Sequence, residues 1–211
     1  MKWAPADIPL INQLKTYLFY KHNVDSYISE TVDIALTDSL QSFIECLPSN
    51  ANILDIGCGS GRDALVLKQQ GFSVVATDAV SEMADAASKT LSQEILVRSC
   101  FNLEFESEFD GVWASASLLH CPKSEIQSAF YNLAKVLKPN GFAYVSLKQG
   151  EGEGFDQLGR YFSYYSEQEI SELLTELGLF TMRKQWLNES MIRGEKQVWL
   201  NLLLQKASHH E

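Results

Sequence analysis

The sequence predicts an α/β fold in which parallel strands alternate with helices. The first observation is a strand–turn–helix unit: an apolar run at 53–56 precedes a glycine-rich turn, and a helical pattern follows at 64–69. The second is that this order repeats, with a strand expected at 73–77 and a helix at 81–91. Short apolar runs that alternate with helical segments are typical of parallel sheets covered by helices.

Composition limits the function classes. The 211 residues are 45% hydrophobic and 11% aromatic, which suffices for one domain with a small appendage. The net charge of −10 argues against a nucleic-acid substrate. It does not exclude one, because an acidic protein can carry a local basic patch. No run of 18 apolar residues predicts a membrane span, and no signal peptide follows the N-terminus, so a cytoplasmic location is expected. We expect a monomer or a homodimer.

The four cysteines do not form a metal-binding or disulfide pattern. They are scattered and lack C-x-x-C spacing. We therefore expect reduced thiols and no metal site. The positions are Cys46, Cys58, Cys100 and Cys121.

The glycine turn has the spacing G-x-G-x-G, from Gly57 to Gly61, and Asp55 lies two residues before it. A dinucleotide-binding turn places its third glycine one residue later and directs a helix N-terminus at a pyrophosphate. A carboxylate at position 55 would repel a phosphate but attract an ammonium group. The turn therefore favours a nucleoside that carries an amino acid over a nicotinamide dinucleotide. The alternative is an ordinary glycine-rich turn.

Asp78 ends the second expected strand, about 20 positions after Gly57, which is the separation expected for an acid that binds ribose hydroxyls. The alternative is an N-cap for the helix at 81–91, for which Ser81 is the better candidate. In the ribose interpretation, Ala79 and Met83 lie near the nucleoside.

The first fifty residues are expected to be helical and separate from the glycine-turn unit. An apolar period of about 3.6 residues predicts the first helix, a second begins near Ser26 and extends to Ile34, and a third covers 38–46 with Asp38 as its cap. Such helices would form a lid or flank. The apolar positions of the first helix are Ile8, Ile11, Leu14, Leu18 and Phe19.

The remaining elements continue the alternation. Ser166 begins a capping-box pattern, and the loop at 148–154 is expected to be mobile and to face the substrate. Strands are expected at 94–98, 109–114, 142–147, 180–186 and 198–205, a helix at 123–137, and turns at 138–141 and 188–196.

Together these motifs resemble the class I S-adenosylmethionine-dependent methyltransferases of the small-molecule type, similar to methyltransferase domains 11 and 25. Residues 52–63 resemble motif I, and FDGVWASASLLHCP at 109–122 resembles motif IV, with LKPNG following at 137–141. The resemblance implies a three-layer, doubly wound, seven-stranded, mostly parallel sheet with an antiparallel final strand. It also implies a helical lid at 1–50, a catalytic domain at 51–206 and a polar tail at 207–211.

The resemblance further implies that S-adenosylmethionine is the cofactor and S-adenosylhomocysteine the product, with in-line transfer of the methyl group to a small molecule. Tyr20 and Tyr27 would hold the sulfonium against their rings, or they are plain packing residues. Asn102 stands where the family often has an acid beside the adenine. The implied cofactor residues are Tyr20, Tyr27, Asp55, Gly57, Cys58, Gly59, Arg62, Asp78, Ala79, Met83, Phe101, Asn102, Ala114 and Ser115.

The acceptor is expected near His120, Arg160, Tyr161 and Tyr164. His120 could accept a proton from the substrate, or it braces the following helix. Arg160 could hold an anionic group, or it pairs with the acidic loop. A non-catalytic protein that senses the cofactor is the alternative from another class, and the absence of G-x-S-x-G disfavours a hydrolase.

Overall fold

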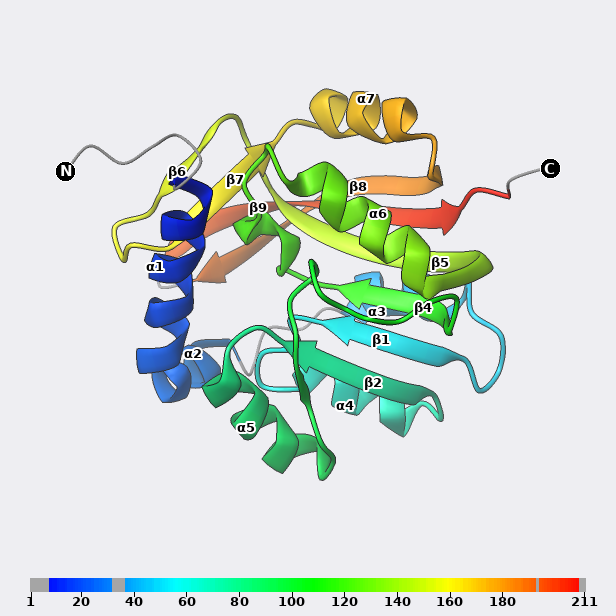
Figure 1. Cartoon of the computed structure of the whole chain (residues 1–211), viewed down its shortest axis with the longest axis horizontal. Helices are drawn as coiled ribbons and strands as arrows, with labels where there is room; N and C mark the ends of the chain where they lie inside the picture. Colours follow the sequence, from blue (N-terminus) through cyan, green and yellow to red (C-terminus); the bar gives the residue numbers. More distant parts are fainter. Residues whose placement is uncertain (1–7, 32–36, 193, 209–211) are drawn as a thin grey trace.

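A computed structural model describes residues 8–31, 37–192 and 194–208 (Figure 1). In this part of the chain, no helix is both long and apolar enough to cross a membrane. The strands are β1 (Asn52–Ile56), β2 (Ser73–Asp78), β3 (Leu96–Val97), β4 (Phe109–Ala114), β5 (Leu137–Gln149), β6 (Glu153–Phe155), β7 (Tyr161–Tyr165), β8 (Phe180–Ile192) and β9 (Glu195–Lys206). The helices are α1 (Ile8–His22), α2 (Val24–Thr31), α3 (Thr37–Ile44), α4 (Arg62–Gln69), α5 (Ser81–Leu91), the 3₁₀ turn η2 (Leu118–His120), α6 (Ile126–Val136) and α7 (Glu167–Leu177).

The described strands build a mainly parallel sheet. The strands β3, β2, β1, β4 and β5 lie side by side in that order, all parallel. β9 returns antiparallel along β5, and β8 pairs antiparallel with β9. These seven strands confirm the predicted doubly wound sheet with an antiparallel final strand. A short antiparallel hairpin, β6–β7, is added at the end of β5 and was not predicted.

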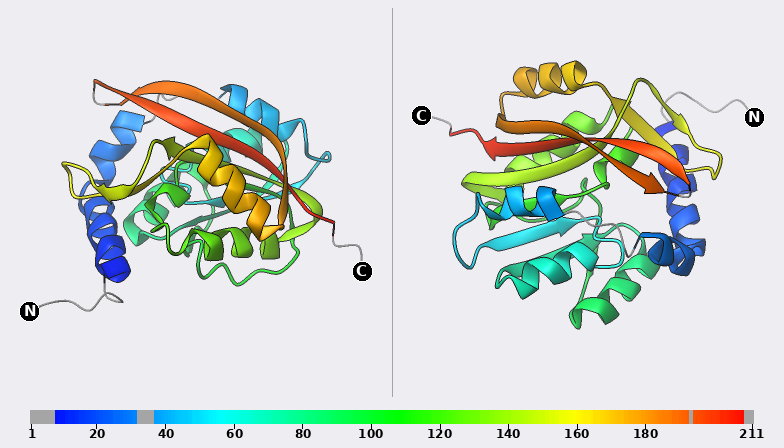
Figure 2. Two further views of the ribbon diagram at one scale, coloured as in Figure 1. Left: turned by 90° about the horizontal axis from the view of Figure 1, so that it is seen from above. Right: turned by 180° about the vertical axis from the view of Figure 1, so that it is seen from behind.

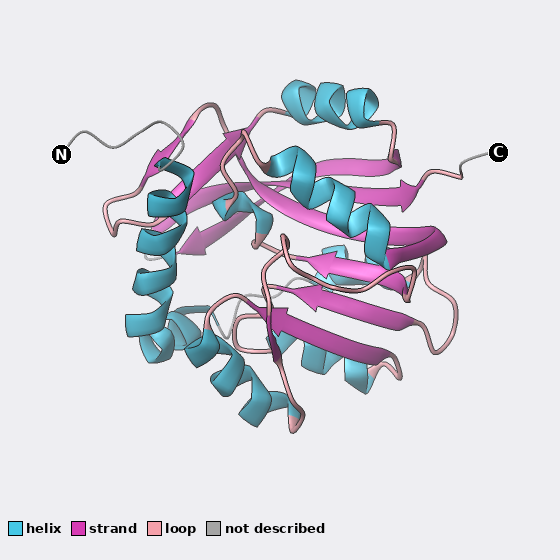
Figure 3. Cartoon of the chain, viewed as in Figure 1, coloured by secondary structure: helices cyan, strands magenta, loops and turns pink. Residues whose placement is uncertain are grey.

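Successive residues of each strand enter different cores. Leu54 and Val112 belong to the core under α6 and α7. Their neighbours Ile53 and Trp113 belong to the core on the opposite face, under α3, α4 and α5. This alternation follows from the two-residue period of a strand. Helices therefore cover both faces, as the colouring in Figure 3 and the view of α3 from behind in Figure 2 show.

The predicted capping box at the start of α7 is present. The backbone N–H of Glu169 donates to the Ser166 hydroxyl at 3.1 Å. The bond satisfies one of the free N–H groups that every helix N-terminus presents. At the other end Gly178 adopts φ 63°, which closes the helix and returns the chain to β8.

Helix α1 stands across the carboxyl ends of the parallel strands (Figure 1) and contacts α5 and β7. The predicted apolar face was wrong for two positions, because the exposed fractions of Leu14 and Leu18 are 54% and 39%. Asn12 and Thr16 are buried instead. The reason is that α1 lies over strand ends, where backbone groups need polar partners: the N–H of Tyr161 donates to the Thr16 hydroxyl at 2.8 Å.

Several boundaries differ from the predictions. The β8–β9 ladder continues to the pair Ile192–Glu195, so most of the predicted turn at 188–196 is strand. In this part of β8, exposed and half-buried side chains alternate, so neither face of the strand is fully buried. Its sequence therefore has no strong apolar alternation and is like that of a loop. The predicted turn at 138–141 is a register shift in the β4–β5 ladder. Ile34 and residues 209–211 lie outside the described residues.

The remaining differences are smaller. β3 has only two residues, and α6 begins at Ile126 rather than at position 123. Part of the loop predicted at 148–154 belongs to β6, because its backbone pairs with β7. All four cysteines are free thiols, as expected.

Phe43 joins α3 to the sheet. Its side chain is fully buried, and its ring centroid lies 5.3 Å from that of Trp113. We expect Phe43→Ala to lower the free energy of unfolding by about 3–5 kcal/mol, because it leaves a cavity in the core. Tyr131→Ala, at a position on α6 that is 53% exposed, should change it by less than about 0.5 kcal/mol. Urea denaturation measures both, and equal losses would contradict the assignment.

Candidate functional site

The glycine turn is held tightly between β1 and α4. The N–H groups of Gly57 and Cys58 both donate to the Thr77 carbonyl, at 2.8 and 2.9 Å. Gly57 has φ 70°, and a Cβ added there would lie 2.5 Å from the Cβ of Ser117. A side chain at this position would therefore clash with the segment after β4. The turn brings its backbone close to that segment and leaves it on the wall of two adjoining cavities.

Asp78 connects this turn to the start of α5. Its Oδ2 accepts from the Gly59 N–H at 3.0 Å, and its Oδ1 accepts from the Val80 N–H at 2.9 Å. Burial raises its pKa to about 6, although the two backbone donors act in the opposite direction. Each oxygen keeps lone pairs for a further donor. The predicted Ser81 cap was wrong: the N-cap residue of α5 is Val80, and no side chain caps it.

Asp55 lies beneath the turn with an unsatisfied oxygen. Only 2% of the residue is exposed, and its Oδ2 has no hydrogen-bond partner among the described residues. Burial, followed by the nearby charges of Asp63 and Asp78, raises its pKa well above the ordinary value. The hydroxyl of Ser117 is likewise buried without a partner in the described chain. Two buried polar groups without partners beside one turn could both bond to a polar ligand, because buried polar groups in proteins are normally hydrogen-bonded.

The smaller cavity has a volume of about 530 Å³ and lies against β2, α5 and the segment after β3. Four of the predicted nucleoside residues line it: Asp78, Ala79, Met83 and Phe101. The structure does not bring Asn102 there, because that side chain is exposed and its Oδ1 accepts from the N–H and hydroxyl of Ser99.

The larger cavity, of about 640 Å³, adjoins the smaller one. Ala114 lines neither cavity and belongs instead to the hydrophobic core. Residues common to both walls are Tyr20, Tyr27, Gly57, Gly59, Ala116 and His120. The other predicted site residues on the larger wall are Asp55, Cys58, Arg62, Ser115, Arg160 and Tyr164.

Tyr20 and Tyr27 bring α1 and α2 against the glycine turn. Their rings meet edge to face with centroids 5.0 Å apart, and a Cβ at Gly59 would lie 3.8 Å from the ring of Tyr27. Arg62 fixes α2 in this place, because its Nη1 donates to the Thr31 carbonyl at 2.6 Å. Its Nε pairs with Asp63 at 2.7 Å. Arg62 thus joins the turn to α2.

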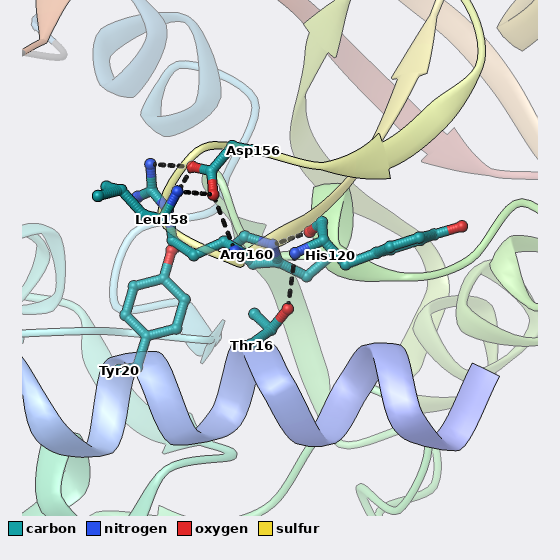
Figure 4. Close-up of polar contacts among 7 residues, drawn as sticks. Thr16, Tyr20, His120, Asp156, Leu158 and Arg160 are labelled. Carbon is teal, nitrogen blue, oxygen red and sulfur yellow. Dashed lines mark hydrogen bonds and ion pairs between the residues drawn. The ribbon is translucent and has the colours of Figure 1, made fainter. Parts of the chain in front are cut away.

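His120 has both ring nitrogens engaged (Figure 4). Nδ1 lies 2.6 Å from the Tyr161 carbonyl oxygen, and Nε2 lies 2.9 Å from the Tyr20 hydroxyl. A carbonyl only accepts, so Nδ1 donates to it and the neutral ring accepts the Tyr20 proton at Nε2. Burial, together with the charges of Arg160 and Lys148, lowers the pKa of His120 to about 4, although the bond to the Tyr161 carbonyl acts in the opposite direction. His120 is therefore neutral near pH 7, and Tyr161 contributes its main chain to this arrangement.

Arg160 is paired with Asp156, at the turn between β6 and β7. Its Nε donates to Oδ2 at 2.8 Å, and its Nη2 lies 2.7 Å from the same oxygen. The sequence left open whether Arg160 holds an anion or pairs with an acidic residue; the pairing exists, with Asp156 rather than with the glutamates at 151 and 153. The guanidinium also lies 5.1 Å from the centroid of Phe162.

Sequence reasoning included Lys148 only as the first residue of the loop expected to face the substrate, and it missed the rest of the part of the larger cavity that β5 and β9 supply, including Ser146, Trp199 and Asn201. The position of Lys148 at the carboxyl end of a parallel strand is a signal that could have identified it. The β9 residues gave no such signal, because they reach the cavity only through antiparallel pairing with β5. Among the described residues, no three His, Cys, Asp or Glu side chains gather where they could hold a metal ion.

The neutral state of His120 predicts a pH effect on stability. Its folded pKa, about 4, lies below the ordinary 6.5, so the unfolded chain takes up the proton first as the pH falls. We expect the wild type to lose up to about 2 kcal/mol more than His120→Gln between pH 7 and pH 5. Asp78 acts in the opposite direction but contributes to both proteins. Urea titrations at the two pH values measure the difference, and parallel losses would show that His120 is not buried as a neutral ring.

Comparison with known proteins identifies a methyltransferase domain. Residues 53–141 match the family model described as "Methyltransferase domain". The tRNA (carboxymethyluridine(34)-5-O)-methyltransferase of Arabidopsis thaliana is 30% identical over 67% of this chain and 36% of its own length. The ubiquinone biosynthesis O-methyltransferase of Rickettsia akari is 36% identical over 46% of this chain and 40% of its own length. The aligned region thus spans about two fifths of these relatives.

A solved structure shares the fold. The 1,6-didemethyltoxoflavin-N1-methyltransferase of Burkholderia thailandensis, solved with 1,6-didemethyltoxoflavin and S-adenosylhomocysteine, superimposes with a TM-score of 0.77 at 20% identity. The superposition covers 99% of this chain and 92% of that one. This likeness supports the doubly wound sheet described above.

Proposed function

We propose that this chain, which belongs to the S-adenosylmethionine-dependent methyltransferases, transfers a methyl group from S-adenosylmethionine to a small-molecule acceptor. The observation that carries the proposal is Asp78, a buried carboxylate that joins the glycine turn to α5 beside a cavity. Ribose hydroxyls would donate to its free lone pairs.

The residues present fit the rest of this cofactor. Asp55 and Ser117 offer buried polar atoms that have no partner in the described chain, which suits the amino-acid end. Met83 and Phe101 offer apolar surface for the adenine. The rings of Tyr20 and Tyr27 suit a positively charged sulfur, because the faces of aromatic rings attract cations.

The bound cofactor supplies an activated methyl group, and the protein has to align the acceptor with it. The two cavities share a wall at Gly57, Tyr20 and His120, which supports an acceptor in the larger one. His120 would act on the acceptor through the Tyr20 hydroxyl, because Nε2 already accepts that proton. In this arrangement His120 is a proton acceptor by relay or a positioning residue. Arg160 and Tyr164 lie on the acceptor side, as does the backbone of Tyr161.

A nucleic-acid acceptor is the second candidate, since a relative is named as a tRNA methyltransferase. The charge distribution favours the small molecule. A phosphate backbone needs an extended basic track, and the chain carries a net charge of −10. A cofactor-binding sensor without catalysis is the remaining alternative.

Cofactor binding is tested with S-adenosylhomocysteine by calorimetry. We expect Asp78→Ala to weaken binding about 10- to 100-fold, because it removes the ribose acceptor and releases the glycine turn. Asp85→Ala makes the same change at an exposed position on α5 and should bind as the wild type does. Unchanged affinity in Asp78→Ala, with its melting temperature retained, would contradict the assignment.

The acceptor class is tested with isotopically labelled methyl donor and a cell extract separated into small molecules and RNA. We expect the wild type to label the small-molecule fraction, and Asp78→Ala to label neither fraction. Label in RNA would establish the nucleic-acid candidate instead. Binding of S-adenosylhomocysteine with no label in either fraction would establish the sensor.

A further inference from the structure

Lys148 is a cation on the wall of the larger cavity with aromatic rings as its neighbours. Its Nζ lies 3.9 Å from the ring centroid of Phe162 and 6.0 Å from that of Tyr164. It is the last residue but one of β5, near the carboxyl edge of the parallel strands where such folds bind ligands. Within the described residues, no carboxylate lies close enough to Lys148 to form an ion pair.

The other cations on this wall are already neutralised. Arg160 pairs with Asp156, and Arg62 pairs with Asp63. Partial burial lowers the pKa of Lys148, and the charge of Arg160 acts in the same direction, while the more distant charges of Asp156 and Glu195 act in the opposite one. A half-buried ammonium group without an ion-pair partner lowers stability unless a bound anion pairs with it.

The surroundings of Lys148 also limit the shape of that anion. Two cations lie near the ring of Phe162: the Nζ of Lys148 is 3.9 Å and the guanidinium carbon of Arg160 is 5.1 Å from its centroid. Tyr164 and Trp199 add further rings to the same wall. Aromatic walls favour flat, conjugated ligands that stack or meet them edge to face.

We propose that the acceptor is a planar, conjugated molecule that binds as an anion, with its negative charge at Lys148 and its ring beside Phe162 and Tyr164. This inference rests on the proposed function, because it identifies the chemical class of the acceptor in that site. An acidic phenol, enol or heteroaromatic N–H fits, because in each of them the atom that carries the negative charge is also the nucleophile.

The proposal explains how methyl transfer proceeds beside a weak base. An acceptor bound as its conjugate base has released its proton to solvent before transfer. Its lone pair then forms the new bond to carbon while the carbon–sulfur bond breaks and its electron pair stays on sulfur. The negative acceptor and the positive sulfonium give two products whose reacting groups are neutral. No residue has to receive a proton during the step, which agrees with a neutral His120.

The test uses 2-naphthoate and 2-naphthamide, which have the same ring and differ in charge. In the presence of S-adenosylhomocysteine, the wild type is expected to bind naphthoate about tenfold more tightly than naphthamide, measured by naphthalene fluorescence. Lys148→Met should reduce this ratio to about one, and Lys148→Arg should retain most of it. Lys184→Met is the matched control, because Lys184 lies 4.6 Å from the ring centroid of Trp186 but outside both cavities.

The proposal is overturned if the wild type binds naphthoate and naphthamide with equal affinity, or binds neither of them more tightly than about 1 mM. It is also overturned if the ratio of the two affinities is the same in Lys148→Met as in the wild type. Calorimetry with S-adenosylhomocysteine alone separates this outcome from failure of the proposed function. If all four proteins bind that compound equally while the naphthoate preference is absent, only the acceptor class is wrong. If the wild type does not bind it, the proposed function fails, and with it the assignment of this pocket to an acceptor.

Discussion

The site depends on one carboxylate that bonds to two backbone segments. Asp78 accepts from Gly59 in the turn and from Val80 at the start of α5, so a single side chain fixes the relative position of β1, β2 and two helices. Burial disfavours the charged form of this carboxylate and raises its pKa to about 6. Each backbone N–H that it accepts favours the charged form, and ribose hydroxyls would favour it further. The same bonds that organise the turn therefore keep a buried acid ionised where a ligand can use it.

Helix α1 then joins the two halves of the site through polar contacts rather than an apolar stripe. Thr16 accepts from the Tyr161 backbone, and Tyr20 donates to His120 four residues further along the same helix face. A buried apolar face would leave the N–H and C=O groups of the strand ends without partners. Since Tyr20 and His120 line both cavities, a shift of α1 would alter the cofactor side and the acceptor side together.

The sequence was sufficient for the features that are local. The strand–turn–helix unit, the positions of Asp55 and Asp78 beside the turn, and the Ser166 cap could be predicted because spacing along the chain determines each of them. Features that depend on distant pairing could not. Trp199 reaches the larger cavity because β9 folds back along β5, and the polar face of α1 exists because β7 begins beneath it. The Arg160–Asp156 pair likewise required the unpredicted β6–β7 hairpin.

The charges around the larger cavity indicate what sort of reaction it favours. His120 is held neutral by burial, and the cations Arg160 and Lys148 oppose its protonation. Both cations lie near the ring of Phe162, and Lys148, which has no ion-pair partner among the described residues, would stabilise negative charge on a molecule placed there. An anionic nucleophile can be produced by a strong general base or stabilised by a nearby positive charge. The two ways compete, because a nearby positive charge lowers the pKa of the base. The residues around the larger cavity fit the second way.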